Sequence, residues 1–275
     1  MTPVTATDTP AARSASTPPS PLAIRALDLV ASEWTKFRSV RSSFWSLLVA
    51  VVTPIGVSTV VAVAFAHAPA SGGSRPDPLL PEVVSLEYAV IAVSVMGVLA
   101  FSAEYSTGLI RTTFAAAPRR RAVLAAKAAV LGAVTLAAGE LVAFASFFLA
   151  QAVLAGHHQG VSLSQPGVPG KVLAAGLLLC VCTMLGLAFG SIIRHTAGGI
   201  AATIAVILLP GILGLLPAPW NGRIGRFALL EAAQQVTALH PAANLFSPGP
   251  SLLVLLAWPA AALAVAAILI TRQDI

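Results

Sequence analysis

A charged stretch between two apolar segments holds most of the side chains that could bind a partner or do chemistry. It runs from Glu104 through Arg111 to the basic cluster Arg119–Arg121 and on to Lys127. Only 9% of the residues are charged and 57% are hydrophobic, so this concentration of charge stands apart from the rest of the chain. A turn between two membrane helices needs polarity but not this order of an acid, a glycine, a proline and a basic cluster. We interpret the stretch as a docking surface.

The apolar side chains inside this stretch are the part that membrane orientation does not explain. Leu109, Ile110 and Phe114 lie in a piece compatible with a short helix, and they would be exposed to the cytosol unless something covers them. Exposed apolar side chains bounded by charge are a common form of interaction surface. The candidate residues of this surface are Glu104, Gly108, Leu109, Ile110, Arg111, Phe114, Pro118, Arg119, Arg120 and Arg121.

Two acidic residues have competing explanations. Glu104 closes an apolar segment, and its simplest role is a solvated charge that pairs with Arg111 or with Arg119–Arg121. Glu140 lies near the centre of another apolar segment, where an ionised carboxylate is costly and usually faces the bundle interior or water. It is either a substrate-pathway or proton-coupling group, or a carboxyl that is hydrogen-bonded to a neighbouring helix. The sequence offers it no obvious basic partner inside the membrane.

Catalytic motifs are not found in the sequence. There is no G-x-x-x-x-G-K-[ST] phosphate-binding loop, no H-E-x-x-H zinc motif and no G-x-S-x-G nucleophile motif. His157 and His158 are adjacent but have no third ligand nearby, and Cys180 and Cys182 point in different directions on one helix. The net charge of +6 comes from basic residues at the ends of apolar segments, which argues against a nucleic-acid partner.

The elements that position these residues are membrane helices. The mean hydropathy of +0.89 is outside the range of soluble domains. Because the apolar runs have no alternating pattern, we expect an all-α membrane protein rather than a barrel. The predicted spans are about 44–66, 83–103, 122–154, 171–193, 197–216 and 251–270 within a membrane domain of residues 44–275. The third is longer than a span needs, so its start is expected to project into the cytosol.

Two segments precede the first predicted span. Residues 1–20, rich in Thr, Ala, Ser and Pro, are expected to be a disordered cytosolic tail. Residues 21–43 are expected to form an amphipathic helix in the cytoplasmic headgroup layer, with Trp34 on its apolar face and Lys36 and Arg38 on its polar one. This helix is either a plain surface anchor or a contact for a cytosolic subunit.

The distribution of basic residues predicts the orientation. With the N-terminus inside, about twelve of the 16 Lys and Arg residues lie on the cytoplasmic side and four on the other. Both termini are therefore expected in the cytoplasm. Between the last two spans, a helical stretch from Ile224 to Leu239 is expected to dip back toward the bilayer.

Two motifs carry a resemblance to a known family. The run from Ser32 to Ser39, which includes Glu33, Trp34, Lys36 and Arg38, resembles the N-terminal segment of actinobacterial ABC transporter permeases of the type-2 exporter class. The stretch from Glu104 to Lys127 is similar to their cytoplasmic loop after the second span, and Arg272–Asp274 fits their ending. The resemblance covers about residues 22–275.

This resemblance implies an architecture and a mechanism. It implies six spans, an interfacial N-terminal helix, a short coupling helix between spans two and three, and short re-entrant helices before span six. Two such subunits, identical or different, would pair above separate ATPase subunits, which would hold Mg-ATP; this chain would have no cofactor and no catalytic residue. Glu104 and residues 107–114 would seat in an ATPase groove, and Arg119–Arg121 would anchor the loop at the lipid surface. The lipophilic or peptide-like substrate would leave the cell through the plasma membrane.

Other functions make different demands. A proton-coupled secondary transporter would use Glu140 and work without an ATPase. An intramembrane enzyme would need a nucleophile and base, or a metal cluster, on facing spans, and the sequence offers neither.

Overall fold

The structure, a computed structural model, describes residues 26–67, 77–116, 119–213, 217, 220–242 and 245–272. The predicted tail at residues 1–20 and the predicted site residue Pro118 lie outside these ranges. Within them the regular structure is helical, with no strand. The helices are α1 (Ala26–Ser39), α2 (Arg41–Ala66), α3 (Leu80–Ser106), α4 (Leu109–Ala116), α5 (Arg120–Ala155), α6 (Val168–Ile193), α7 (Thr196–Leu213), α8 (Trp220–Gly225), α9 (Leu229–Thr237) and α10 (Pro248–Arg272).

Five of these helices are long and apolar enough to cross a membrane. They are α2 from Ser43, α3, α5, α6 and α10, and the chain is therefore a multi-pass membrane protein by the length and composition of its helices. The predicted fifth span, 197–216, corresponds to α7, which is apolar but shorter. At 36 residues α5 would extend about 54 Å, well beyond a bilayer core of roughly 30 Å.

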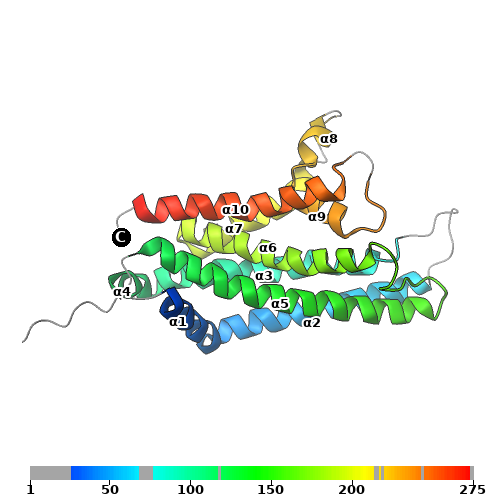
Figure 1. Ribbon diagram of the computed structural model, residues 1–275. Coiled ribbons are helices and arrows are strands. Elements are labelled where there is room, and N and C mark those ends of the chain that lie inside the picture. Colours follow the sequence, from blue (N-terminus) through cyan, green and yellow to red (C-terminus); the bar gives the residue numbers. More distant parts are fainter. Residues whose placement is uncertain are drawn as a thin grey trace, which may run out of the picture.

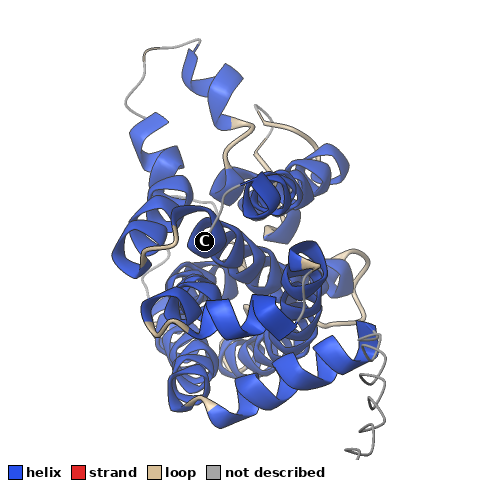
Figure 2. Ribbon diagram, turned by 90° about the vertical axis from the view of Figure 1, so that its left-hand side faces the viewer, coloured by secondary structure: helices blue, strands red, loops and turns tan. Residues whose placement is uncertain are grey.

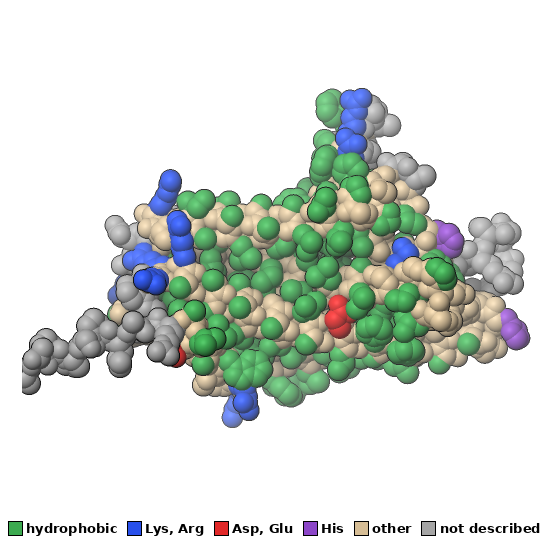
Figure 3. All heavy atoms as spheres, in the orientation of Figure 1, with side chains coloured by type: hydrophobic (Ala, Val, Ile, Leu, Met, Phe, Trp, Pro, Cys, Tyr) green, Lys and Arg blue, Asp and Glu red, His purple; other side chains and the backbone are tan. Residues whose placement is uncertain are grey.

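The long helices lie side by side, and the short helices gather at the two ends (Figure 1). One end carries α1, α4, the start of α5 and the end of α10, and we call it the basic end. Viewed from this end, the long helices point toward the reader and shorter helices lie across them (Figure 2). Most of the Lys and Arg side chains visible in Figure 3 lie at the basic end or on α8, whereas hydrophobic side chains cover the middle of the bundle.

The most buried of the five long helices is α6, which packs against α3, α5, α7 and α10. Glycine makes the contact between α3 and α6 close. A Cβ atom at Gly97 would overlap the backbone oxygen of Thr183, and one at Gly186 would overlap that of Ser94. Small residues allow such approach in membranes, where packing replaces the hydrophobic effect between helices.

The prediction at the N-terminal end needs a small correction. Residues 21–25 of the predicted helix lie outside the described ranges, and over the rest the structure has α1 from Ala26 to Ser39, an extended residue at Val40 and α2 from Arg41. The break lets α1 turn away from α2 and lie across the basic end (Figure 1).

The expected helical stretch Ile224–Leu239 is two helices, α8 and α9, with a break at residues 226–228. The apolar face of α9, including Leu229 and Ala232, is buried against α6, α7 and α10. The carboxylate of Asp77 accepts hydrogen bonds from the backbone N–H groups of Leu239 and His240 at 2.8 and 3.1 Å, which joins the start of α3 to the chain after α9.

Candidate functional site

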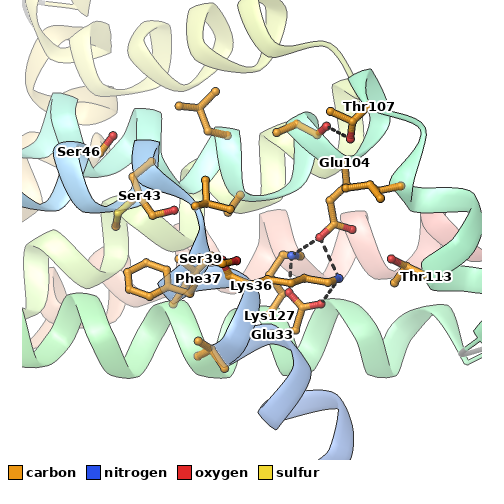
Figure 4. A pocket seen from close by; sticks show the side chains of 18 of the residues that line it. Glu33, Lys36, Phe37, Ser39, Ser43, Ser46, Glu104, Thr107, Thr113 and Lys127 are labelled. Atoms are coloured by element: carbon orange, nitrogen blue, oxygen red, sulfur yellow. Dashed lines mark hydrogen bonds and ion pairs between the residues drawn. The ribbon is translucent and has the colours of Figure 1, made fainter.

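Four charged side chains from three helices form a closed ring at the basic end (Figure 4). Glu33 and Lys36 come from α1, Glu104 from the end of α3, and Lys127 from the second turn of α5. Because acids and bases alternate around it, each carboxylate contacts both ammonium groups and the ring has no net charge. We call these four residues the ion ring.

The distances in the ion ring are those of direct, charge-assisted hydrogen bonds. Lys127 Nζ donates to Glu33 Oε2 at 2.5 Å and to Glu104 Oε1 at 2.7 Å. Lys36 Nζ donates to Glu33 Oε1 at 2.7 Å and to Glu104 Oε1 at 3.2 Å. Such bonds are roughly twice as strong as neutral ones, and here they connect α1, α3 and α5.

Three of the four side chains in the ion ring are buried. The side-chain exposure is 4% for Glu33, 6% for Lys127 and 10% for Glu104, against 39% for Lys36. Burial works against the charged form of Lys36, but the hydrogen bond and the negative charge of Glu33, followed by those of Glu104, outweigh it. The pKa of Lys36 is therefore raised, and this side chain is charged at neutral pH.

A cavity of about 470 Å³ lies beside the ion ring, between α1, the start of α2, α3, α4 and α5. All four ring residues line it, together with hydroxyl side chains such as Ser43 and apolar ones further along α3 and α5. Glu104 Oε2 is buried and has no hydrogen-bond partner, so one of the four carboxylate oxygens of the ion ring accepts no hydrogen bond.

The expected role of Glu104 as a solvated end charge is thus wrong. Its salt-bridge partners are Lys36 and Lys127, at 3.2 and 2.7 Å. A helix end normally projects into solvent, but here Lys36 of α1 and Lys127 of α5 reach the end of α3 and bond the carboxylate.

The short helix expected after Gly108 is present as α4, but its apolar side chains are not all exposed. Gly108 has φ +74°, which favours glycine and lets the chain turn from α3 into α4. Ile110 is 2% and Phe114 9% exposed, because both pack into the core between α3, α5 and α10. Leu109 is 56% exposed, and Arg111 is exposed as well. Of the three apolar residues predicted to be exposed, Leu109 lies on the surface, whereas Ile110 and Phe114 hold α4 in the core.

The basic cluster is only partly a surface feature. Arg119 is exposed. Arg120 lies over the ring of Phe114 at 5.4 Å and donates to the backbone oxygen of Ile270 at 3.3 Å. Arg121 donates to the backbone oxygen of Ala267 at 3.1 Å. Both bonds go to carbonyls in the last two turns of α10, where cations are favoured, so two of the three arginines join α5 to α10.

Helix α1 presents a different face to the bundle than its apolar pattern indicates. Trp34 is 44% exposed and Leu27 78% exposed, while Glu33 is buried. Arg38 is exposed. The ion pair of Glu33 with Lys127 therefore lies at the contact of α1 with α5. Part of the predicted apolar face of α1 is exposed and can contact lipid.

Glu140 lies where α5 crosses α6. A Cβ atom at Gly176 would come within 2.7 Å of Glu140 Oε2, which is buried and has no hydrogen-bond partner. Glu140 is far along α5 from Lys127, so the structure does not bring it into the ion ring.

The pairing of Glu33 with Lys127 was missed by sequence reasoning, although one signal pointed to it. Lys127 lies five residues inside the apolar segment predicted from residue 122. A lysine so placed is almost never buried without an acidic partner. Within the described ranges, no group of three or more His, Cys, Asp and Glu side chains is arranged to hold a metal ion.

Comparison of the chain with protein-family models and with curated proteins finds no match.

Proposed function

We propose that this chain is the membrane-spanning permease subunit of an ATP-driven exporter of the type-2 ABC class. In this proposal α7 is the fifth of six spans, α1 is the interfacial helix, α4 is the coupling helix, and α8 and α9 form the re-entrant segment. A separate ATPase binds Mg-ATP, and two permease subunits form the pathway for a lipophilic or peptide-like substrate.

The observation that supports this most is the way α4 is attached. Ile110 and Phe114 hold its inner face in the core, while Leu109 and Arg111 remain on its outer face. A helix that only turned the chain would need no such anchors. One that receives force from a partner needs an exposed face for the partner and a rigid connection to the spans, and α4 has both.

The ion ring extends this connection. It joins α3, which leads into α4, to α1 and α5 through three hydrogen bonds between helices, and a fourth within α1 completes the ring. Movement of α4 would therefore shift three helices together rather than bend one. In the proposed mechanism, ATP binding brings the ATPase subunits together, pushes on α4 and moves the bundle between inward-facing and outward-facing states.

The proposed orientation places the basic end in the cytoplasm, in the plasma membrane. The excess of Lys and Arg at that end is the pattern of cytoplasmic segments. The ATPase would meet α4 there.

The proposal predicts that Arg111→Glu abolishes ATP-driven export and weakens the ATPase complex while leaving the subunit folded in the membrane. Arg111 is exposed on α4, so reversing its charge changes the contact surface and not the core. Glu104 is a poor site for this test because it belongs to the ion ring. The subunit is purified from native membranes, and the co-purifying protein is assayed for ATP hydrolysis.

The matched control is Arg272→Glu, an exposed arginine at the same end of the bundle but on α10. It should retain the ATPase at the wild-type level. Equal recovery of ATPase with Arg111→Glu and the wild type would refute α4 as the docking helix. If the wild type brings no ATPase, the exporter proposal fails.

Glu140 supports a second candidate, a proton-coupled secondary transporter. Its buried, unpartnered oxygen at the crossing of α5 and α6 is the type of site that proton relays use. In that case Glu140→Gln would abolish transport, and a proton ionophore would do the same to the wild type without any ATPase. Transport by Glu140→Gln at the wild-type rate in proteoliposomes would exclude this candidate.

A further inference from the structure

We propose that the cavity beside the ion ring binds one single-tailed amphiphile with a primary ammonium head group. The inference concerns binding to this chain alone, so it holds whether or not an ATPase drives the protein.

The walls of the cavity change from charged to apolar along two helices at once. On α3 the lining passes from Glu104 to Leu99 and Met96, and on α5 it passes from Lys127 to Val130 and Leu131. From Glu104 to Met96 the lining of α3 covers about 12 Å at the rise of an α-helix. A cavity with charge at one end and hydrocarbon at the other matches an amphiphile rather than a uniformly polar solute.

The ion ring determines which head group fits. Every other carboxylate oxygen of the ring accepts at least one hydrogen bond from a lysine, but Glu104 Oε2 accepts none. Glu104 Oε2 is closed to water in this structure, so the carboxylate has to turn toward the cavity before a ligand can reach it. A buried acceptor without a donor costs free energy, and a ligand whose N–H group then bonds this oxygen removes that cost. An anionic head would instead bring a negative charge to an oxygen that already carries one.

The volume limits the ligand to one tail. A cavity of about 470 Å³ is in the range of sites that enclose one small molecule. The hydroxyl groups of Ser43 and Thr113 lie on opposite sides of the ion ring (Figure 4), and both residues line the cavity.

The test measures binding of radiolabelled dodecylammonium to the full chain in nanodiscs of phosphatidylcholine and phosphatidylglycerol, by equilibrium dialysis with empty nanodiscs as the blank. We expect one saturable site per chain. Unlabelled dodecylammonium should displace the label at least tenfold better than dodecyltrimethylammonium, which has the charge but no N–H donor, or dodecyl sulfate. Equal displacement by dodecyltrimethylammonium would overturn the proposal.

Two variants locate the site. Glu104→Gln removes the charge and replaces a free acceptor with an amide, so it should weaken dodecylammonium binding about tenfold. Ala103→Leu fills the cavity from an exposed position on its wall and leaves the ion ring intact, so it should abolish saturable binding. The matched control is Ala137→Leu, exposed on α5 and outside the cavity lining, which should bind like the wild type.

Saturable binding that survives Ala103→Leu would overturn the proposal even if Glu104→Gln fails to fold. Replacing phosphatidylcholine with phosphatidylethanolamine separates the natural sources of the ammonium. A fall in dodecylammonium affinity would show that a two-tailed membrane lipid competes for the site and would overturn the limit to one tail, whereas an unchanged affinity supports a site for a free single-tailed amine.

Discussion

Lys127→Met is expected to lower the free energy of unfolding by about 3–5 kcal/mol, because it removes one partner from a buried ion pair. Lys127 Nζ is shared by Glu33 and Glu104, and all three side chains are at most 10% exposed. Methionine keeps the length of the side chain, so the loss comes from charge and not from a cavity. The measurement is unfolding in mixed detergent micelles titrated with sodium dodecyl sulfate.

Lys36→Met provides the matched control for this prediction. It removes the other lysine of the same ion ring, but that side chain is 39% exposed and water can replace part of its contacts. We expect a loss of about 1 kcal/mol or less. If Lys36→Met lowers the free energy of unfolding as much as Lys127→Met does, the burial of the lysine does not determine the loss and the prediction is wrong.

A double variant distinguishes repulsion between the two carboxylates from the loss of their attraction to Lys127. Adding Glu104→Gln to Lys127→Met removes one of the two carboxylates that are then left with Lys36 as their one shared cation in the ion ring. The double variant should therefore be more stable than Lys127→Met alone, which is the non-additivity expected for groups in one network. A double variant that is less stable would show that Glu104 is held in place by other contacts.

The helices were predictable because a membrane leaves the backbone few alternatives. In hydrocarbon every N–H and C=O group must be satisfied within the segment, so long apolar runs indicate helices directly. The predicted segments 171–193 and 251–270 differ from α6 and α10 by only a few residues at each end. The short helix α4 was also expected, because Gly108 marks where the chain can turn.

The site was less predictable because its contacts join distant parts of the chain. Glu33 and Lys127 are 94 residues apart, and no local pattern connects them. The same applies to Ile110 and Phe114. Their burial depends on how α4 rotates against α5 and α10, which the composition of the loop does not determine. Sequence reasoning placed the charged stretch correctly at one end of the bundle but assigned Glu104 the wrong partners.

The crossing of α3 and α6 should respond strongly to a single methyl group. A Cβ atom at Gly186 would overlap the backbone oxygen of Ser94 and come within 3.2 Å of the backbone nitrogen of Val98. Backbone atoms inside two packed helices cannot rotate away as a side chain can, so the helices must separate. We expect Gly186→Ala to lower the free energy of unfolding by about 3 kcal/mol, the upper part of the range for overpacked cores.

Gly132→Ala is the matched control in the same assay. Gly132 is also a helical glycine that faces α6, but its nearest neighbours are the flexible Met184 side chain at 3.9 Å and Cys180 at 4.0 Å. The added methyl group fits without movement, and alanine is favoured over glycine in a helix by up to about 1 kcal/mol. We expect no loss of stability. Equal effects of the two substitutions would mean that the close approach of α3 and α6 is not what makes Gly186 necessary.

The pair Gly97 and Gly186 gives the most specific form of this prediction. A Cβ atom at Gly97 would overlap the backbone oxygen of Thr183, so each glycine relieves the same crossing from one of its two helices. Once Gly186→Ala has forced α3 and α6 apart, a second methyl group at Gly97 meets less resistance. The double variant should therefore cost clearly less than the sum of the single ones. If the two losses in the free energy of unfolding add strictly, each methyl group strains the helices on its own. In that case α6 does not move away from α3 as one unit.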